Sequence, residues 1–131
     1  MAKMIHSMIR VVNESKSLQF YQTILNLTEK RRIAFDSFCL IYLGNDESDF
    51  ELELTVNFDT KCAYTHGNGY GHLAVSAENI ERIHQKASAL GDQPKDIKSF
   101  YNGDELVAKF FFINDPDGYA IEVIERSDTY S

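Results

Sequence analysis

The sequence lacks several features that would place it in a specialised class of protein. It has no tryptophan, and only two of its 131 residues are cysteine. Two thiols cannot build a disulfide framework, and Cys39 and Cys62 form no CxxC metal motif, so we expect free thiols in a reducing cytoplasm. Apolar runs are far shorter than the ~20 residues of a membrane helix, and we expect no secretory signal and no membrane partner.

Basic residues are scarce as well. The chain has 13 lysines and arginines against 20 aspartates and glutamates, a formal net charge of −7. Nucleic-acid-binding proteins usually carry a basic face, so we expect no nucleic-acid partner. A few local basic groups can still hold an anionic small ligand. The length and the hydrophobic content of 44% suit one domain over residues 1–131, or two small repeats that share a core.

The pattern of apolar residues predicts such a repeat. The first half is expected to hold a strand, a helix and three strands, at residues 3–12, 14–27, 29–43 (two strands) and 50–58. After a polar, glycine-rich segment at 59–69, the same order restarts at residues 70–77, 79–90, 93–104 (irregular, with one short strand), 105–113 and 119–125. We therefore predict an α+β protein of two βαβββ modules, approximately residues 1–58 and 69–126.

Two residue types recur at matching places in the two modules. His6 opens the first module and His72 the second, while Glu53 and Glu122 each lie in the last strand of a module. Side chains alternate between the faces of a strand, so His6, His72 and Glu122 share their faces with buriable residues, whereas Glu53 shares its face with Glu51 and Thr55 and has Leu52 and Leu54 on the opposite face. A carboxylate placed there is costly unless it is paired or bound to a cation.

The four residues allow two interpretations. Two imidazoles and two carboxylates can supply four protein ligands to a divalent metal. Alternatively, the histidines are hydrogen-bonded core residues and the glutamates lie at solvent-exposed strand edges, as polar residues of antiparallel sheets commonly do. The residues alone leave both interpretations open.

Four segments together carry a resemblance to a known family: HSMIRV, ELELTVNF, GYGHLAVS and DPDGYAIEVIE. In this order they resemble lactoylglutathione lyase (glyoxalase I), of the vicinal oxygen chelate superfamily. The resemblance implies paired βαβββ modules, each a half-open barrel around a metal, and a homodimer. It implies a site shared between subunits, with His6 and Glu53 from one subunit and His72 and Glu122 from the other.

The resemblance also implies the reaction. The family isomerises the hemithioacetal of methylglyoxal and glutathione to S-lactoylglutathione, with Glu122 as the main base and Glu53 as its symmetric counterpart. Because the zinc branch of the family usually has glutamine where this chain has His6, and because the chain is short, Ni²⁺ or Co²⁺ is favoured over Zn²⁺. Arg10 and Asn57, each four residues after an expected ligand, match the family's glutathione contacts.

Two departures from the family's pattern leave the thiol open. Asn68 stands where some members carry an arginine for glutathione, and residues 92–105 diverge from the family's lysine- and glycine-rich stretch. The thiol is therefore either glutathione or another low-molecular-weight thiol. The fold is also compatible with a different metal enzyme of the superfamily (an epimerase, a thiol transferase or a dioxygenase) and with a metal-free small-molecule-binding protein. For Tyr70, which shares the face of His72, we expect a role in core packing.

Overall fold

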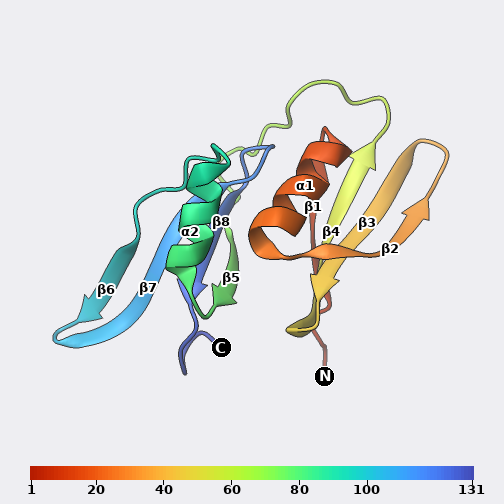
Figure 1. The fold of residues 1–131 in the computed structure, drawn as a ribbon. Helices are drawn as coiled ribbons and strands as arrows, with labels where there is room; N and C mark the ends of the chain where they lie inside the picture. Colours follow the sequence, from red (N-terminus) through yellow and green to blue (C-terminus); the bar gives the residue numbers. More distant parts are fainter. The chain divides into compact units, whose positions relative to one another are not determined.

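Each half of the chain folds as a βαβββ module, which confirms the predicted α+β class. The computed structural model describes residues 1–131 in two compact units, Met1–Thr65 and His66–Ser131. The N-terminal module contains β1 (His6–Val11), α1 (Glu14–Leu25), β2 (Thr28–Ala34), β3 (Phe38–Asn45) and β4 (Ser48–Asn57). The C-terminal module contains β5 (Leu73–Ala77), α2 (Ile80–Ala89), β6 (Lys98–Asn102), β7 (Glu105–Asn114) and β8 (Ala120–Glu125), as Figure 1 shows.

The N-terminal sheet has the order β1-β4-β3-β2 and stays open. Its outer strand β1 runs parallel to β4, while the other neighbours are antiparallel. Helix α1 covers one face (Figure 1), because alternate residues of the strands are apolar on that side. Ile9, Ile41 and Leu54 lie side by side there and are at most 4% exposed. The opposite face carries His6 on β1 and Glu53 on β4.

Capping residues fix the ends of α1. The side chain of Asn13 accepts a hydrogen bond from the backbone N–H of Lys16, as an N-cap residue does. At the other end, Asn26 adopts the left-handed conformation (φ 55°), and its N–H and that of Leu27 donate to carbonyls of the last turn. Asn13 and Ser15 are both plausible N-caps by residue type, and the structure selects Asn13.

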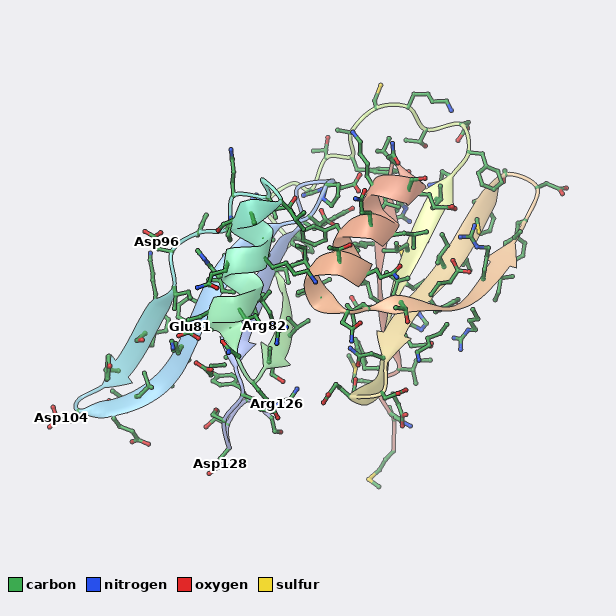
Figure 2. The ribbon with its side chains drawn as sticks, in the orientation of Figure 1. Glu81, Arg82, Asp96, Asp104, Arg126 and Asp128 are labelled. Carbon is green, nitrogen blue, oxygen red and sulfur yellow. The ribbon has the colours of Figure 1, made fainter.

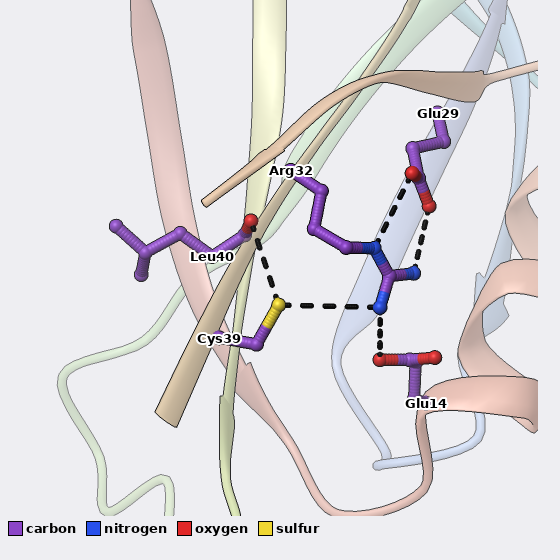
Figure 3. Close-up of polar contacts among 5 residues, drawn as sticks. All are labelled: Glu14, Glu29, Arg32, Cys39 and Leu40. Atoms are coloured by element: carbon purple, nitrogen blue, oxygen red, sulfur yellow. Dashed lines mark hydrogen bonds and ion pairs between the residues drawn. The ribbon is translucent and has the colours of Figure 1, made fainter. Parts of the chain in front are cut away.

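An ion-pair cluster ties the first turn of α1 to β2 (Figure 3). The Arg32 guanidinium donates to Glu14 at 2.9 Å and to Glu29 at 2.8 Å, and it lies 4.0 Å from the sulfur of Cys39. These bonds raise the pKa of Arg32 and lower that of Glu29. Cys39 is buried beneath the cluster, whereas Cys62 is exposed, and both are free thiols as expected.

The C-terminal sheet repeats the arrangement, with the order β5-β8-β7-β6 and a parallel β5–β8 pair. Phe111, Ile121 and Val123 are fully buried on the side covered by α2 (Figure 1). Residues 115–118 (DPDG), whose residue types suit a type I turn, join the antiparallel strands β7 and β8. In it Gly118 (φ 85°) donates to the Asp115 carbonyl, and the Asp115 carboxylate accepts from the N–H groups of Asp117 and Tyr119.

Two local predictions differ from the structure. The strand expected at residues 70–77 begins only at Leu73, so residues 70–72 lie before it. The four-residue spacing of Glu78 and Arg82 in the sequence predicts an ion pair on a helix, but the pair does not form, because Glu78 precedes the N-cap Asn79 and lies outside α2. Glu78 instead lies 3.8 Å from Arg126, which follows β8 and is labelled with Arg82 in Figure 2. Neither α1 nor α2 is long and apolar enough to cross a membrane.

Candidate functional site

The first predicted pair, His6 and Glu53, lies on the face of the N-terminal sheet opposite α1. Glu53 pairs with Met8 across the parallel strands β4 and β1, so His6 lies two residues earlier on the same face. This diagonal brings His6 Nε2 within 2.8 Å of Glu53 Oε2. The Glu53 side chain is only 10% exposed, so its contact with the imidazole offsets part of the cost of burying a carboxylate.

The second predicted pair repeats this diagonal. Glu122 pairs with Ala74 across β8 and β5, and His72 lies two residues before Ala74. His72 Nε2 lies 3.5 Å from Glu122 Oε1, and the Glu122 side chain is 17% exposed. Both modules therefore present one imidazole nitrogen and one carboxylate oxygen on the sheet face away from their helix.

An aromatic ring contacts the histidine of each pair. Tyr42 on β3 is the cross-strand neighbour of Glu53 and meets the His6 ring edge-on at 5.7 Å. Phe112 on β7 is the neighbour of Glu122 and meets the His72 ring edge-on at 5.3 Å. Tyr42 is not among the site residues that the sequence predicts. Strand register is the signal that finds it, because the residue opposite Glu53 in the sheet also contacts the His6 ring.

The surroundings of the two pairs differ in polarity. Near the first pair, the Arg31 guanidinium lies 4.0 Å above the Tyr42 ring and 3.0 Å from Glu51, whose register partner is His6. The residues next to Glu122 on its face of the sheet are apolar (Ala74, Phe112, Ala120 and Ile124), and the polar Ser76 and Asn114 lie further along the same face. The immediate strand neighbours of Glu122 are thus less polar than those of Glu53.

The donor geometry of both pairs comes close to that of a divalent-cation site. Two ligand atoms about 2.1 Å from one cation, at roughly 90–110°, lie about 3.0–3.4 Å apart. The His–Glu separation is just below that range in the first pair, at 2.8 Å, and just above it in the second, at 3.5 Å. Neither module gathers a third histidine, cysteine or acidic residue with its pair into a potential metal site. One module therefore supplies two ligands, and a four-ligand centre needs both pairs.

The predicted thiol contacts lie on the same face as the first pair. Arg10 is exposed on β1 opposite Thr55, and Asn57 ends β4 two residues beyond Thr55. The Asn57 amide donates one hydrogen bond to the Tyr64 hydroxyl at 2.9 Å, and its nitrogen carries a second proton. These two polar groups extend the face from Glu53 toward the end of β4.

Tyr70 does more than fill the core. Its hydroxyl donates to the carbonyl of Ala120 at 2.9 Å, and its ring lies 5.2 Å from that of Tyr119. Burial raises the pKa of Tyr70, and the nearby charge of Asp115 adds to the shift. The phenol is therefore a hydrogen-bond donor at neutral pH.

Comparison with known proteins identifies the family of the chain. The sequence matches the glyoxalase/bleomycin resistance protein/dioxygenase superfamily over residues 3–123. It is 37% identical to a lactoylglutathione lyase of Neisseria meningitidis, over 95% of this chain and 91% of that protein. It is also 37% identical to a probable lactoylglutathione lyase of Synechocystis, over 95% of both chains. The chain belongs to the lactoylglutathione lyase family. Both His–Glu pairs lie inside the matched range.

Solved structures of the family share the fold. The trypanothione-dependent glyoxalase I of Leishmania major superposes with a TM-score of 0.76 and 29% identity, over 95% of this chain and 87% of that one. Glyoxalase I of Zea mays gives a TM-score of 0.84 over 96% of this chain and 45% of that one, and at 24% identity it supports the fold alone. The membership makes the chain an enzyme.

Proposed function

We propose that this enzyme isomerises the hemithioacetal of methylglyoxal and a low-molecular-weight thiol, with glutathione as the first choice, to the corresponding S-lactoyl thioester. The observation that carries the proposal is the duplicated pair. A histidine nitrogen and a glutamate oxygen meet at 2.8 Å in one module and 3.5 Å in the other, at equivalent register positions. The family relatives named lactoylglutathione lyase support the reaction assigned to this site.

The proposed metal ligands are His6, Glu53, His72 and Glu122. Because each module supplies only two of them, the centre needs the His6–Glu53 pair of an N-terminal module together with the His72–Glu122 pair of a C-terminal module. We propose that these come from the two subunits of a homodimer, and that residues 1–131 act as one domain in it. Mixed nitrogen and oxygen ligands suit Ni²⁺ and Co²⁺ as well as Zn²⁺. The histidine at position 6 is the basis for proposing Ni²⁺ or Co²⁺, in a cytoplasmic enzyme.

The reaction moves one proton between adjacent carbons. The C1–H bond of the hemithioacetal breaks, a C2–H bond forms, and the hydroxyl proton passes from one oxygen to the other, so no oxidant or reductant is needed. A bound divalent cation would act as a Lewis acid that stabilises the negative charge on the two oxygens of the enediolate. Glu122 takes the proton from C1 and returns it to C2.

The surroundings of the two glutamates support this assignment. The cross-strand partners of Glu122, Ala74 and Phe112, are apolar, so His72 is the polar side chain that faces its carboxylate. Glu53 lies beside His6, with Tyr42 and the Arg31–Glu51 pair close by. Glu53 therefore serves chiefly as a ligand, as the symmetric counterpart of the base.

Arg10 and Asn57 are the proposed contacts for the thiol. Glutathione has two carboxylates, and a guanidinium can bind a carboxylate through two parallel hydrogen bonds. Both residues lie on the face of the first pair, so a thiol bound by them would place its sulfur toward Glu53. The Leishmania major relative is trypanothione-dependent, which supports keeping a thiol other than glutathione in the proposal.

The test is a reconstitution assay. The purified full-length protein is stripped with a chelator, loaded separately with Ni²⁺, Co²⁺ or Zn²⁺, and assayed for thioester formation from methylglyoxal and glutathione. We expect activity with Ni²⁺ or Co²⁺ and its loss in Glu122→Gln. Stoichiometric metal binding without activity, either with glutathione or with another thiol, would contradict the proposed reaction, although the proposed metal site would still be supported. Absence of cation binding would contradict the metal centre itself.

A further inference from the structure

The two histidines of the candidate site are held in different ways. His6 lies inside β1, where its backbone is paired with Glu51 of β4. His72 lies one residue before β5, which begins at Leu73. His72 itself has no ladder partner, and the ladder constrains its backbone only from the Leu73 side.

The nearest cross-tie is made by Tyr70. Its hydroxyl donates to the carbonyl of Ala120, the first residue of β8, at 2.9 Å. Tyr70 stands two residues before His72, and Ala120 stands two residues before Glu122. The bond thus joins the two chain segments at equal distances from the two site residues. The β5–β8 ladder begins at Leu73 and Ile121, one residue after His72 and one residue before Glu122.

Two further rings hold Tyr70 in place. His66 is stacked on Tyr119 at 4.0 Å with an angle of 11° between the rings, and the Tyr70 ring meets Tyr119 at 5.2 Å. His66 and Tyr70 are 5.9 Å apart. The Nε2 atom of His66 is buried and has no hydrogen-bond partner, so that edge of the ring acts only by packing. Tyr119 ends the turn whose backbone the Asp115 carboxylate fixes through two hydrogen bonds.

We propose that Tyr70, supported by His66 and Tyr119, is a positioning residue that sets the separation of His72 and Glu122. The three rings join the loop that leads to His72 to the turn that leads to Glu122. The N-terminal pair does not need a comparable set of ring contacts, because His6 is itself part of β1. The consequence for cation affinity rests on the proposed function, but the position of His72 can be measured without any metal.

The first measurement is made on the metal-free, full-length protein with labelled histidines. We expect the NMR signals of the His72 ring to shift and broaden in Tyr70→Phe, which keeps the ring and removes the hydroxyl. The His6 signals of the same sample are the internal reference and should stay unchanged. Tyr101→Phe, which removes the same atom from an exposed tyrosine of β6, is the matched control and should alter neither ring.

A second pair of variants separates positioning from general stabilisation. His66→Phe retains a flat ring that can stack on Tyr119, so we expect His72 signals like those of the wild type. His66→Ala removes the stack and should shift and broaden them. Equal changes at His6 and His72 in Tyr70→Phe, or no change at either, would overturn the proposal.

The second measurement is a Co²⁺ titration of the stripped proteins. Loss of an outer-shell partner typically weakens metal binding about 10–100-fold, and Tyr70 acts through the backbone, so we expect a loss near 10-fold in Tyr70→Phe and none in Tyr101→Phe. An unchanged Co²⁺ affinity in Tyr70→Phe would overturn the proposed role of Tyr70 in metal binding. If the wild type binds no Co²⁺, the proposed function fails, while the His72 signals still decide whether Tyr70 positions the pair.

Discussion

His6 and His72 occupy the same position in their modules, two residues before the strand residue that pairs with a glutamate. Met8 pairs with Glu53 in the first module, and Ala74 pairs with Glu122 in the second. The parallel pairing of the first and last strand of each module creates this diagonal. A duplicated module thus presents one imidazole nitrogen and one carboxylate oxygen in the same arrangement twice.

The unequal surroundings of the glutamates predict unequal effects of mutation. Glu122→Gln keeps the shape of the side chain but cannot accept the C1 proton, so we expect kcat to fall about 10²–10⁴-fold. Glu53→Gln is the matched variant and should lower kcat less, because Glu53 acts chiefly as a ligand. Turnover is measured with saturating Ni²⁺, and bound metal is quantified in both variants. Equal losses of kcat at equal metal content would contradict the assignment of Glu122 as the main base.

Much of this site could be predicted from the sequence because its signals are local. The alternation in residues 51–57 places Glu53 on one face and Leu52 and Leu54 on the other, and the structure shows this. The turn at Asp115–Gly118 follows from its residue types, and it fixes the start of β8.

The parts that could not be predicted depend on contacts between distant segments. Tyr42 and Phe112 join the site through strand register, which the composition of β3 and β7 does not reveal. Strand β5 begins at Leu73 because pairing with β8 starts there, although the alternation of side chains extends back to Tyr70. The partner of Glu78 is Arg126, 48 residues away, and no spacing rule reaches so far.

The exposed Arg10 on the face of the first pair predicts a role in thiol affinity. Arg10→Lys keeps the charge but loses the two-pronged geometry, so we expect KM for the glutathione hemithioacetal to rise about 10-fold with little change in kcat. Arg82→Lys on α2 is the matched control and should change neither constant. Glutathione ethyl ester, in which one carboxylate is blocked, identifies the group that Arg10 binds. An effect of Arg10→Lys that persists undiminished with the ester would show that Arg10 does not bind that carboxylate.

The Arg32 cluster predicts a pH-dependent contribution to stability. The hydrogen bond from Arg32 lowers the pKa of Glu29, so the carboxylate favours the folded state above its ordinary pKa. The contribution is lost as the pH falls through the lowered pKa. Because both side chains are more than one-third exposed, we expect only about 0.3–1 kcal/mol.

The measurement is thermal unfolding of Glu29→Gln across pH. At pH 7 the variant should melt about 1–4 °C below the wild type, and the difference should vanish toward pH 3. Glu105→Gln, on the exposed start of β7, is the matched control and should match the wild type at both pH values. A difference that stays constant down to pH 3 would show that the loss does not arise from the charge of Glu29.

The two His–Glu pairs predict complementation between inactive subunits. His6→Ala damages the N-terminal pair and Glu122→Ala the C-terminal pair, so each homodimer should be inactive. If sites are shared between subunits, a mixed dimer has one site with both lesions and one with neither. An equal mixture after refolding should therefore recover about a quarter of the wild-type activity. The control mixes His6→Ala with Glu53→Ala, whose lesions fall in the same pair, so that every site keeps a lesion and no activity returns. Lack of recovery with His6→Ala and Glu122→Ala, once subunit exchange has been demonstrated, would contradict the shared site and place all four ligands in one chain.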